Sequence, residues 1–179
     1  MATELFYLSK SANIKLISQL LIPMEITKIP HKILSKTTEK VGLKDIKNGL
    51  YRELVLDMKK AMVDNEGVGL GANQISKDLS VFVIDAKLAE ENNVPEAYFN
   101  PEITEYSRDK DEMEEGCLSI PGFGANLKRS KKIKIKAIDE NGNKIKFKAR
   151  GFLARVFQHE TDHLNGTTIR DRHSEISKS

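Results

Sequence analysis

Residues 158–163 read QHETDH, and most of what the sequence predicts follows from this stretch. It contains an HExxH motif. Side chains four residues apart project from the same face of a helix, so His159 and His163 can reach the same metal ion. Glu160 follows the first histidine and can contact a water at the metal without being a ligand itself. A chance match is improbable in a chain of this length, so the pattern favours a metal site carried by a helix.

The flanking residues predict where that helix begins and ends. It starts at Gly151, and Phe152 and Val156 fall at successive turns together with the two histidines. The turn pair Asn165-Gly166 then stops it. The motif is therefore expected on one amphipathic helix late in the chain.

The segments before this helix read as short strands and one further helix. Lysine alternates with apolar residues over 132–137 and again over 144–148, with turn residues between them, which predicts a hairpin whose lysines face water. The apolar run 81–84 predicts a buried strand and residues 97–103 a weaker one, whereas the spacing over 50–63 predicts an amphipathic helix. Together these patterns predict an α+β fold in which antiparallel strands surround a central helix that bears the HExxH motif.

Two polar segments read as loops. Residues 86–96 are polar, and residues 105–115 are so densely charged that a solvated loop is the expected structure. The first residues mix apolar side chains with Ser and Lys, without the pattern of a secretory signal. The expected division is an N-terminal extension over 1–28, helical or disordered, one domain over 29–172 and a short C-terminal tail over 173–179.

The composition limits the classes of function. With 179 residues the chain is long enough for one domain with a buried core. The net charge of +3 is small, the lysines are spread out and aromatic residues are few, so no specific nucleic-acid site is evident. No apolar run is long enough to cross a bilayer. Cys117 is the only cysteine, so an intrachain disulfide cannot form and a reducing compartment is expected.

A catalytic metal of this kind usually takes three protein ligands and keeps a position open for water, so a third ligand is needed. Neither of the usual positions for a third ligand downstream of the motif is filled. Metzincin proteases have a histidine at the position that Ile169 occupies here. Other zincins have a glutamate on a separate downstream helix, and Glu175 lies too near His163 for that arrangement. Cys117 lies upstream, between glycine and leucine. It could be a small buried residue, but a thiolate is a strong ligand for a borderline metal, and the neighbouring glycine lets the backbone approach a substrate. Cys117 is therefore the predicted third ligand.

Three motifs together resemble those of one family. The segments GVGLGANQ (67–74), EGCLS (115–119) and QHETDH (158–163) appear in the order and approximate spacing seen in peptide deformylases. The likeness covers roughly residues 29–172, so it implies that the domain predicted there is the catalytic domain. It implies a deformylase-like fold and a metal-dependent hydrolase. Such an enzyme removes the N-formyl group from the N-terminal formyl-methionine of newly synthesised polypeptides and releases formate.

The resemblance also assigns roles to individual residues. Three side chains would bind the metal: Cys117, His159 and His163. Glu160 would be the general base and acid, and Gln74 with the backbone N–H of Leu118 would stabilise the developing oxyanion. The backbone of Gly69 would pair with the peptide in a strand-like manner. Three further residues would help to form the pocket for the first methionine: Val68, Met113 and Phe152.

The implied cofactor is one divalent metal ion per chain. The family typically uses Fe²⁺, with Zn²⁺, Ni²⁺ or Co²⁺ able to occupy the same ligands, and the ligand types in this sequence do not choose among them. The implied substrates are N-formyl-methionyl nascent polypeptides, with the ribosome near its exit tunnel as a candidate partner. This setting is the cytoplasm of a bacterium, with an organelle as the alternative.

Two other functions start from the same residues. A small HExxH zinc endopeptidase would use the same helix, but that function leaves Cys117 and Gln74 without roles. A non-enzymatic binding module with a degenerate deformylase-like fold is the second. The retention of Glu160 and of all three metal ligands argues against it.

Overall fold

The computed structural model describes residues 24–176, so most of the extension predicted over 1–28 lies outside the described residues. Secondary-structure elements follow one another in this order: η1 (Lys32–Ser35), α2 (Leu43–Lys47), α3 (Arg52–Asp64), β1 (Gly69–Gly71), η2 (Ala72–Ile75), β2 (Val81–Ile84), α4 (Ala86–Asn92), β3 (Ala97–Tyr106), β4 (Lys110–Gly116), β5 (Gly124–Ser130), β6 (Lys132–Ile138), β7 (Lys144–Arg150), α5 (Gly151–Leu164) and α6 (Ile169–Ile176).

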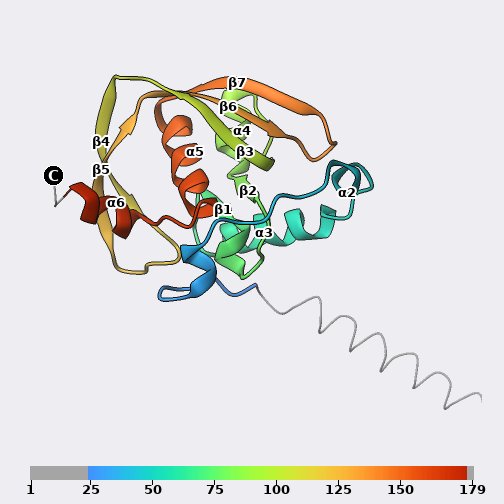
Figure 1. Cartoon of the computed structure of the whole chain (residues 1–179), viewed down its shortest axis with the longest axis horizontal. Coiled ribbons are helices and arrows are strands. Elements are labelled where there is room, and N and C mark those ends of the chain that lie inside the picture. The colour runs from blue at the N-terminus through green and yellow to red at the C-terminus, as the bar shows by residue number, and fades with distance from the viewer. Residues whose placement is uncertain (1–23, 177–179) are drawn as a thin grey trace, which may run out of the picture.

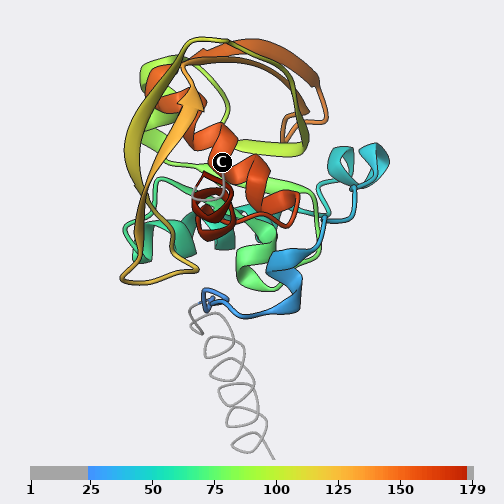
Figure 2. The ribbon, with the colours of Figure 1, turned by 60° about the vertical axis from the view of Figure 1, so that its left-hand side comes forward.

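Antiparallel strands surround α5. Five of them form a sheet in the order β1-β2-β3-β6-β7, and β4 pairs with β5 in a separate two-stranded ribbon. The curved sheet wraps around α5, as Figures 1 and 2 show, and α5 contacts every strand of the sheet as well as β5. α3 packs against β1 and β2. The predicted α+β class is confirmed.

Aromatic rings fill the space between the sheet and α5. Phe82 on β2, Tyr98 on β3 and Phe157 on α5 have no exposed surface. The Tyr98 ring centroid lies 4.8 Å from each of the other two, and Phe147 on β7 lies 5.9 Å from Phe157. Ring pairs at these separations add specific attraction to the burial of their large apolar area. This cluster fixes α5, and with it the HExxH motif, against the sheet.

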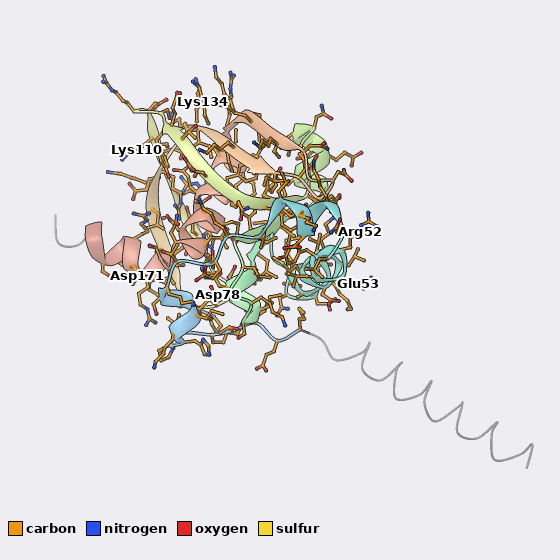
Figure 3. All side chains as sticks on the ribbon, turned by 45° about the vertical axis from the view of Figure 1, so that its right-hand side comes forward. Arg52, Glu53, Asp78, Lys110, Lys134 and Asp171 are labelled. Atoms are coloured by element: carbon orange, nitrogen blue, oxygen red, sulfur yellow. The ribbon has the colours of Figure 1, made fainter. Side chains whose placement is uncertain are left out.

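Most predicted elements are present. The hairpin is formed by β6 and β7, and its inward residues are buried or partly buried while its lysines point outward, as Lys134 does in Figure 3. The predicted helices and the strand over 81–84 correspond to α3, α5 and β2. The strand predicted over 97–103 continues to Tyr106. Its register shifts between Phe99 and Glu102, around Pro101, which would otherwise interrupt a ladder of hydrogen bonds.

The two predicted loops are wrong in part. Within 86–96 the chain forms α4, because Asp85 caps the helix by accepting a hydrogen bond from the N–H of Leu88 and because Leu88 and Ala89 are buried. Within 105–115 the chain forms the end of β3 and most of β4, which pairs residue by residue with β5. Charge density alone did not indicate that these residues have strand partners.

The end of the described chain forms α6, which contacts β5. This helix extends from Ile169 to Ile176 and so crosses the boundary predicted between 172 and 173. Among residues 24–176 no helix is long and apolar enough to span a membrane.

Candidate metal centre and active site

The two histidines of the HExxH motif lie next to each other on α5. His159 and His163 are one turn apart, and their ring centroids are separated by 4.9 Å. Cys117 directly follows β4, and its Sγ lies 3.1 Å from Nε2 of His163. The three potential ligand atoms all lie within 4.8 Å of one another. The structure therefore brings together the three predicted metal ligands from distant parts of the chain.

This donor set fits a divalent metal ion. One thiolate and two imidazoles are typical ligands of zinc and other first-row metals. Burial lowers the pKa of His163 well below its usual value, so its imidazole is neutral. Burial alone would also lower the pKa of His159, but hydrogen bonds with Cys117 and Glu115 outweigh it and raise the pKa to about 10. Metal binding would displace this proton, since a ligating imidazole nitrogen carries none.

Glu160 is a buried proton acceptor beside these donors. Its side chain is largely inaccessible, and its Oε2 has no hydrogen-bond partner among the described residues. Burial raises the pKa of Glu160 to about 7. Gly69 on β1 leaves room for this carboxylate, because a Cβ at that position would overlap with Oε1 of Glu160. A carboxyl group in this environment can exchange a proton near neutral pH.

Gln74 and Leu118 offer two N–H donors near Cys117. Oε1 of Gln74 accepts a hydrogen bond of 2.8 Å from the N–H of Gly71, and its Nε2 donates to Oγ of Ser119 at 3.2 Å. The same Nε2 lies 3.8 Å from Sγ of Cys117. The backbone N–H of Leu118 donates to no other group within residues 24–176. Both donors are therefore in position to reach a ligand bound next to the cysteine.

A cavity of about 400 Å³ opens onto these groups. Its wall contains Cys117, His159, Glu160, Gln74 and Leu118, and it includes three of the residues expected to bind substrate: Val68, Gly69 and Phe152. Val68 and Phe152 are about half exposed, so they offer apolar surface to a ligand. The fourth, Met113, is an exposed residue of β4 outside this wall, and its role stays a prediction.

Comparisons with known proteins agree with this geometry. A family model described as polypeptide deformylase matches residues 23–179. The chain belongs to the polypeptide deformylase family. The peptide deformylase of Aquifex aeolicus (strain VF5) is 44% identical over 151 residues, covering 83% of this chain and 86% of that protein.

Solved structures of deformylases have the same fold. The crystal structure of peptide deformylase from Thermotoga maritima matches with a TM-score of 0.76 at 36% identity, covering 84% of this chain and 97% of the other. The Met-Ala-Ser-bound crystal structure of the class I type b enzyme from Acinetobacter baumannii matches with a TM-score of 0.74 at 29% identity, covering 84% and 98%. Polypeptide deformylases are hydrolases that remove the N-formyl group from nascent peptides, so the predicted enzyme class and reaction are confirmed and the endopeptidase alternative is not favoured.

One functional residue of this deformylase was missed in the sequence. Glu115 lies in the segment predicted to be a solvated loop, yet it is buried and its Oε2 accepts a hydrogen bond of 3.0 Å from Nδ1 of His159. Arg129 donates to Glu115 at 2.6 and 2.9 Å, and Arg155 donates to it at 2.6 Å. Burial alone would raise the pKa of Glu115, but hydrogen bonds with His159 and Arg129 lower it to about 2. Glu115 therefore stays ionised and fixes the ring orientation of His159.

Asp162, the second carboxylate of the HExxH segment, bonds to arginines and not to a histidine. It accepts a hydrogen bond of 2.7 Å from Arg129 and forms an ion pair with Arg172 on α6. The sequence contains a pattern that could have indicated that Arg129 is buried. On β5, Ala125, Leu127 and Arg129 occupy alternate, inward positions. An arginine in such a series indicates a buried carboxylate partner.

Proposed function

We propose that this chain deformylates N-formyl-methionyl peptides with Glu160 as general base and acid and with one divalent metal ion held by Cys117, His159 and His163. The observation that carries the proposal is the convergence of three metal donors, one thiol and two imidazoles, beside a buried carboxyl group whose Oε2 has no hydrogen-bond partner among residues 24–176. When bound, the ion would supply Lewis acidity that polarises the formyl carbonyl and makes water a better nucleophile.

Glu160 would move the proton. Its pKa of about 7 allows it to accept a proton from the attacking water and later to release it to the departing amine. The water adds to the formyl carbon, the C–N bond then breaks, and formate and a free N-terminus are the products. Nε2 of Gln74 and the N–H of Leu118 would donate to the oxygen on which negative charge grows. Because Gly71 and Ser119 already hold the Gln74 amide, little reorganisation is needed.

The sheet offers a place for the peptide. β1 is an edge strand of the five-stranded sheet, so the backbone of Gly69 can pair with an extended peptide that adds to this edge. The first methionine would lie against Val68 and Phe152 in the cavity wall, and we propose that Met113 on β4 adds to this pocket. A formyl carbon carries only hydrogen besides its oxygen and nitrogen, so a tight site next to Glu160 would exclude larger acyl groups.

The finer assignments rest on the family resemblance. We infer that Fe²⁺ is the native metal, since the family typically uses it, with Zn²⁺, Ni²⁺ or Co²⁺ as alternatives for the same donors. The proposed substrates are nascent chains that emerge from the ribosome, and the proposed setting is the bacterial cytoplasm. Residues 29–172 are proposed as the catalytic domain, with 1–28 as an added extension.

The test is formate release from formyl-Met-Ala-Ser, compared with acetyl-Met-Ala-Ser and an unblocked longer peptide. Protein prepared without oxygen and loaded with Fe²⁺ or Ni²⁺ should release formate from the formyl peptide alone. Glu160→Gln keeps the shape of the side chain and should lower kcat by at least about 100-fold with metal still bound, because the proton acceptor is lost.

Glu112→Gln, at an exposed position on β4, is the matched control and should keep full activity. A folded, metal-loaded wild-type protein that releases no formate contradicts the proposal. Cleavage inside the unblocked peptide would point to the endopeptidase instead.

A further inference from the structure

Asn73 is a fully buried amide beside the metal centre. It belongs to η2, directly before Gln74, and its Nδ2 donates a hydrogen bond of 2.6 Å to the backbone carbonyl of His163. That carbonyl lies in the last turn of α5, where carbonyl groups have no N–H partner within the helix. The N–H of Gly166, however, already donates to it at 3.0 Å. The bond from Asn73 is therefore additional to what the helix end requires.

The other half of the Asn73 side chain has no partner. Oδ1 of Asn73 and Nδ1 of His163 are both buried, and neither has a hydrogen-bond partner among residues 24–176. The side chains of Asn73 and His163 both border the position that a side chain on residue 71 would occupy. A Cβ on Gly71 would lie there, 3.0 Å from Oδ1 of Asn73 and 3.5 Å from Cβ of His163. The unpaired amide oxygen therefore lies on the His163 side of η2, at a place that only a residue without a side chain at position 71 leaves uncrowded.

Burial of an unpaired amide oxygen is unfavourable, so a site that keeps one usually has a use for it. A metal-ligating histidine commonly donates its second ring N–H to an acceptor, which fixes the ring and strengthens the ligand. Glu115 serves His159 in this way. For His163, the acceptor available among the described residues is the unpaired oxygen of Asn73, whose NH₂ group already donates to the His163 backbone.

We propose that Asn73 is a positioning residue for His163. Its NH₂ group holds the backbone of His163, and its Oδ1 serves as the acceptor for Nδ1–H. The inference rests on the proposed role of His163 as a metal ligand. Since Asn73 directly precedes Gln74, the same short turn would hold a metal ligand and an oxyanion donor in fixed relation.

The test uses Asn73→Leu, which keeps the volume of the side chain and removes both polar atoms. In the full chain, the Zn²⁺ dissociation constant, measured by competition with a chelator, should rise about 10- to 100-fold. The absorption bands of the Co²⁺-substituted protein should shift as the geometry at His163 loosens. The urea midpoint of the metal-free protein should stay the same or rise, because the variant removes an unpaired buried oxygen.

Asn92→Leu is the matched control, since its amide also donates to a helix carbonyl, that of Leu88 in α4, far along the chain from the centre. It should leave the Zn²⁺ affinity and the Co²⁺ spectrum unchanged. A lower urea midpoint for Asn73→Leu with unchanged metal affinity would overturn the proposal and leave Asn73 a structural residue. If the wild-type protein itself bound neither metal, the proposed metal centre would fail, which is a separate result.

Discussion

The two sides of α5 are held in different ways. One side packs apolar residues such as Leu153, Ala154 and Phe157 into the aromatic cluster beneath the five-stranded sheet. The other side carries Arg155, His159 and Asp162 toward the ribbon of β4 and β5, where each meets a charged partner. All of these residues are buried except His159, which is partly buried. The second side contains Glu115, the carboxylate that orients His159.

The difference separates stability from positioning. The apolar side gains free energy from buried area, with little demand on the exact direction of any one side chain. The charged side gains less, because removing ions from water offsets much of their attraction, but it fixes directions: Glu115 receives hydrogen bonds from two arginines and from His159. We therefore expect changes on the two sides to differ in their dependence on pH and in their effect on metal binding.

The largest loss of stability is expected from Phe157→Ala. Phe157 is fully buried among Phe82, Tyr98 and Phe147, so the substitution leaves a cavity and should lower the free energy of unfolding by about 3–5 kcal/mol. The loss should be the same at pH 5 and pH 8, and the metal affinity of the folded protein should change little. Urea unfolding of the metal-free protein at both pH values measures it. Phe157→Leu refills most of the volume, so it should lower the free energy of unfolding far less. A loss from Phe157→Ala that depended strongly on pH would contradict the contrast between the two sides.

The apolar side could be predicted from the sequence because its signal is local. Periodicity over 151–166 and alternation over 132–148 indicated α5 and the hairpin, and both are present. The metal ligands could be predicted for a similar reason, since two of them share one helix turn and Cys117 is the only cysteine. These inferences needed no knowledge of which distant segments meet.

The charged side could not be predicted because its signal is not local. Glu115 ends a stretch of charged residues that looks solvated, and only pairing of β4 with β5 places Arg129 against it. Asp162, available one turn from His159 in the sequence, is directed to Arg129 instead. The contact of Asn73 with His163 was hidden in the same way, since it forms only when η2 packs against the end of α5.

Glu115→Gln tests the charged side with a change of one charge and almost no change of volume. The pKa of Glu115 is lowered from 4.5 to about 2, so its ionised form stabilises the fold by about 3 kcal/mol above pH 4.5, and this contribution is lost as the pH falls toward 2. The variant should therefore be less stable than wild type at pH 7 by about that amount, with a gap that narrows at pH 3. Urea unfolding of the metal-free proteins at the two pH values gives the gap.

The same variant should also weaken metal binding. Without the carboxylate that accepts from Nδ1, His159 is a poorer and less well oriented ligand, so the metal dissociation constant should rise about 10- to 100-fold in chelator competition. Glu112→Gln, exposed on the same strand, should change neither quantity measurably. Equal gaps at pH 7 and pH 3, or unchanged metal affinity, would contradict the role assigned to Glu115.

The smallest loss of stability is expected from breaking an exposed ion pair. Comparison with this pair shows how much the contribution of the charged side to stability depends on burial. Lys60 and Asp64 form a pair at 2.5 Å one turn apart on α3, with side chains 65% and 42% exposed. Lys60→Met keeps the apolar stem and the helix propensity, so it should lower the free energy of unfolding by only about 0.3–0.5 kcal/mol, and this loss should vanish in 1 M NaCl because salt screens exposed charges. Urea unfolding at low and high salt measures it. The loss from Glu115→Gln should persist at high salt, because its partners lie where mobile ions do not reach; if both losses vanish alike, the network around Glu115 is no more protected than a surface pair.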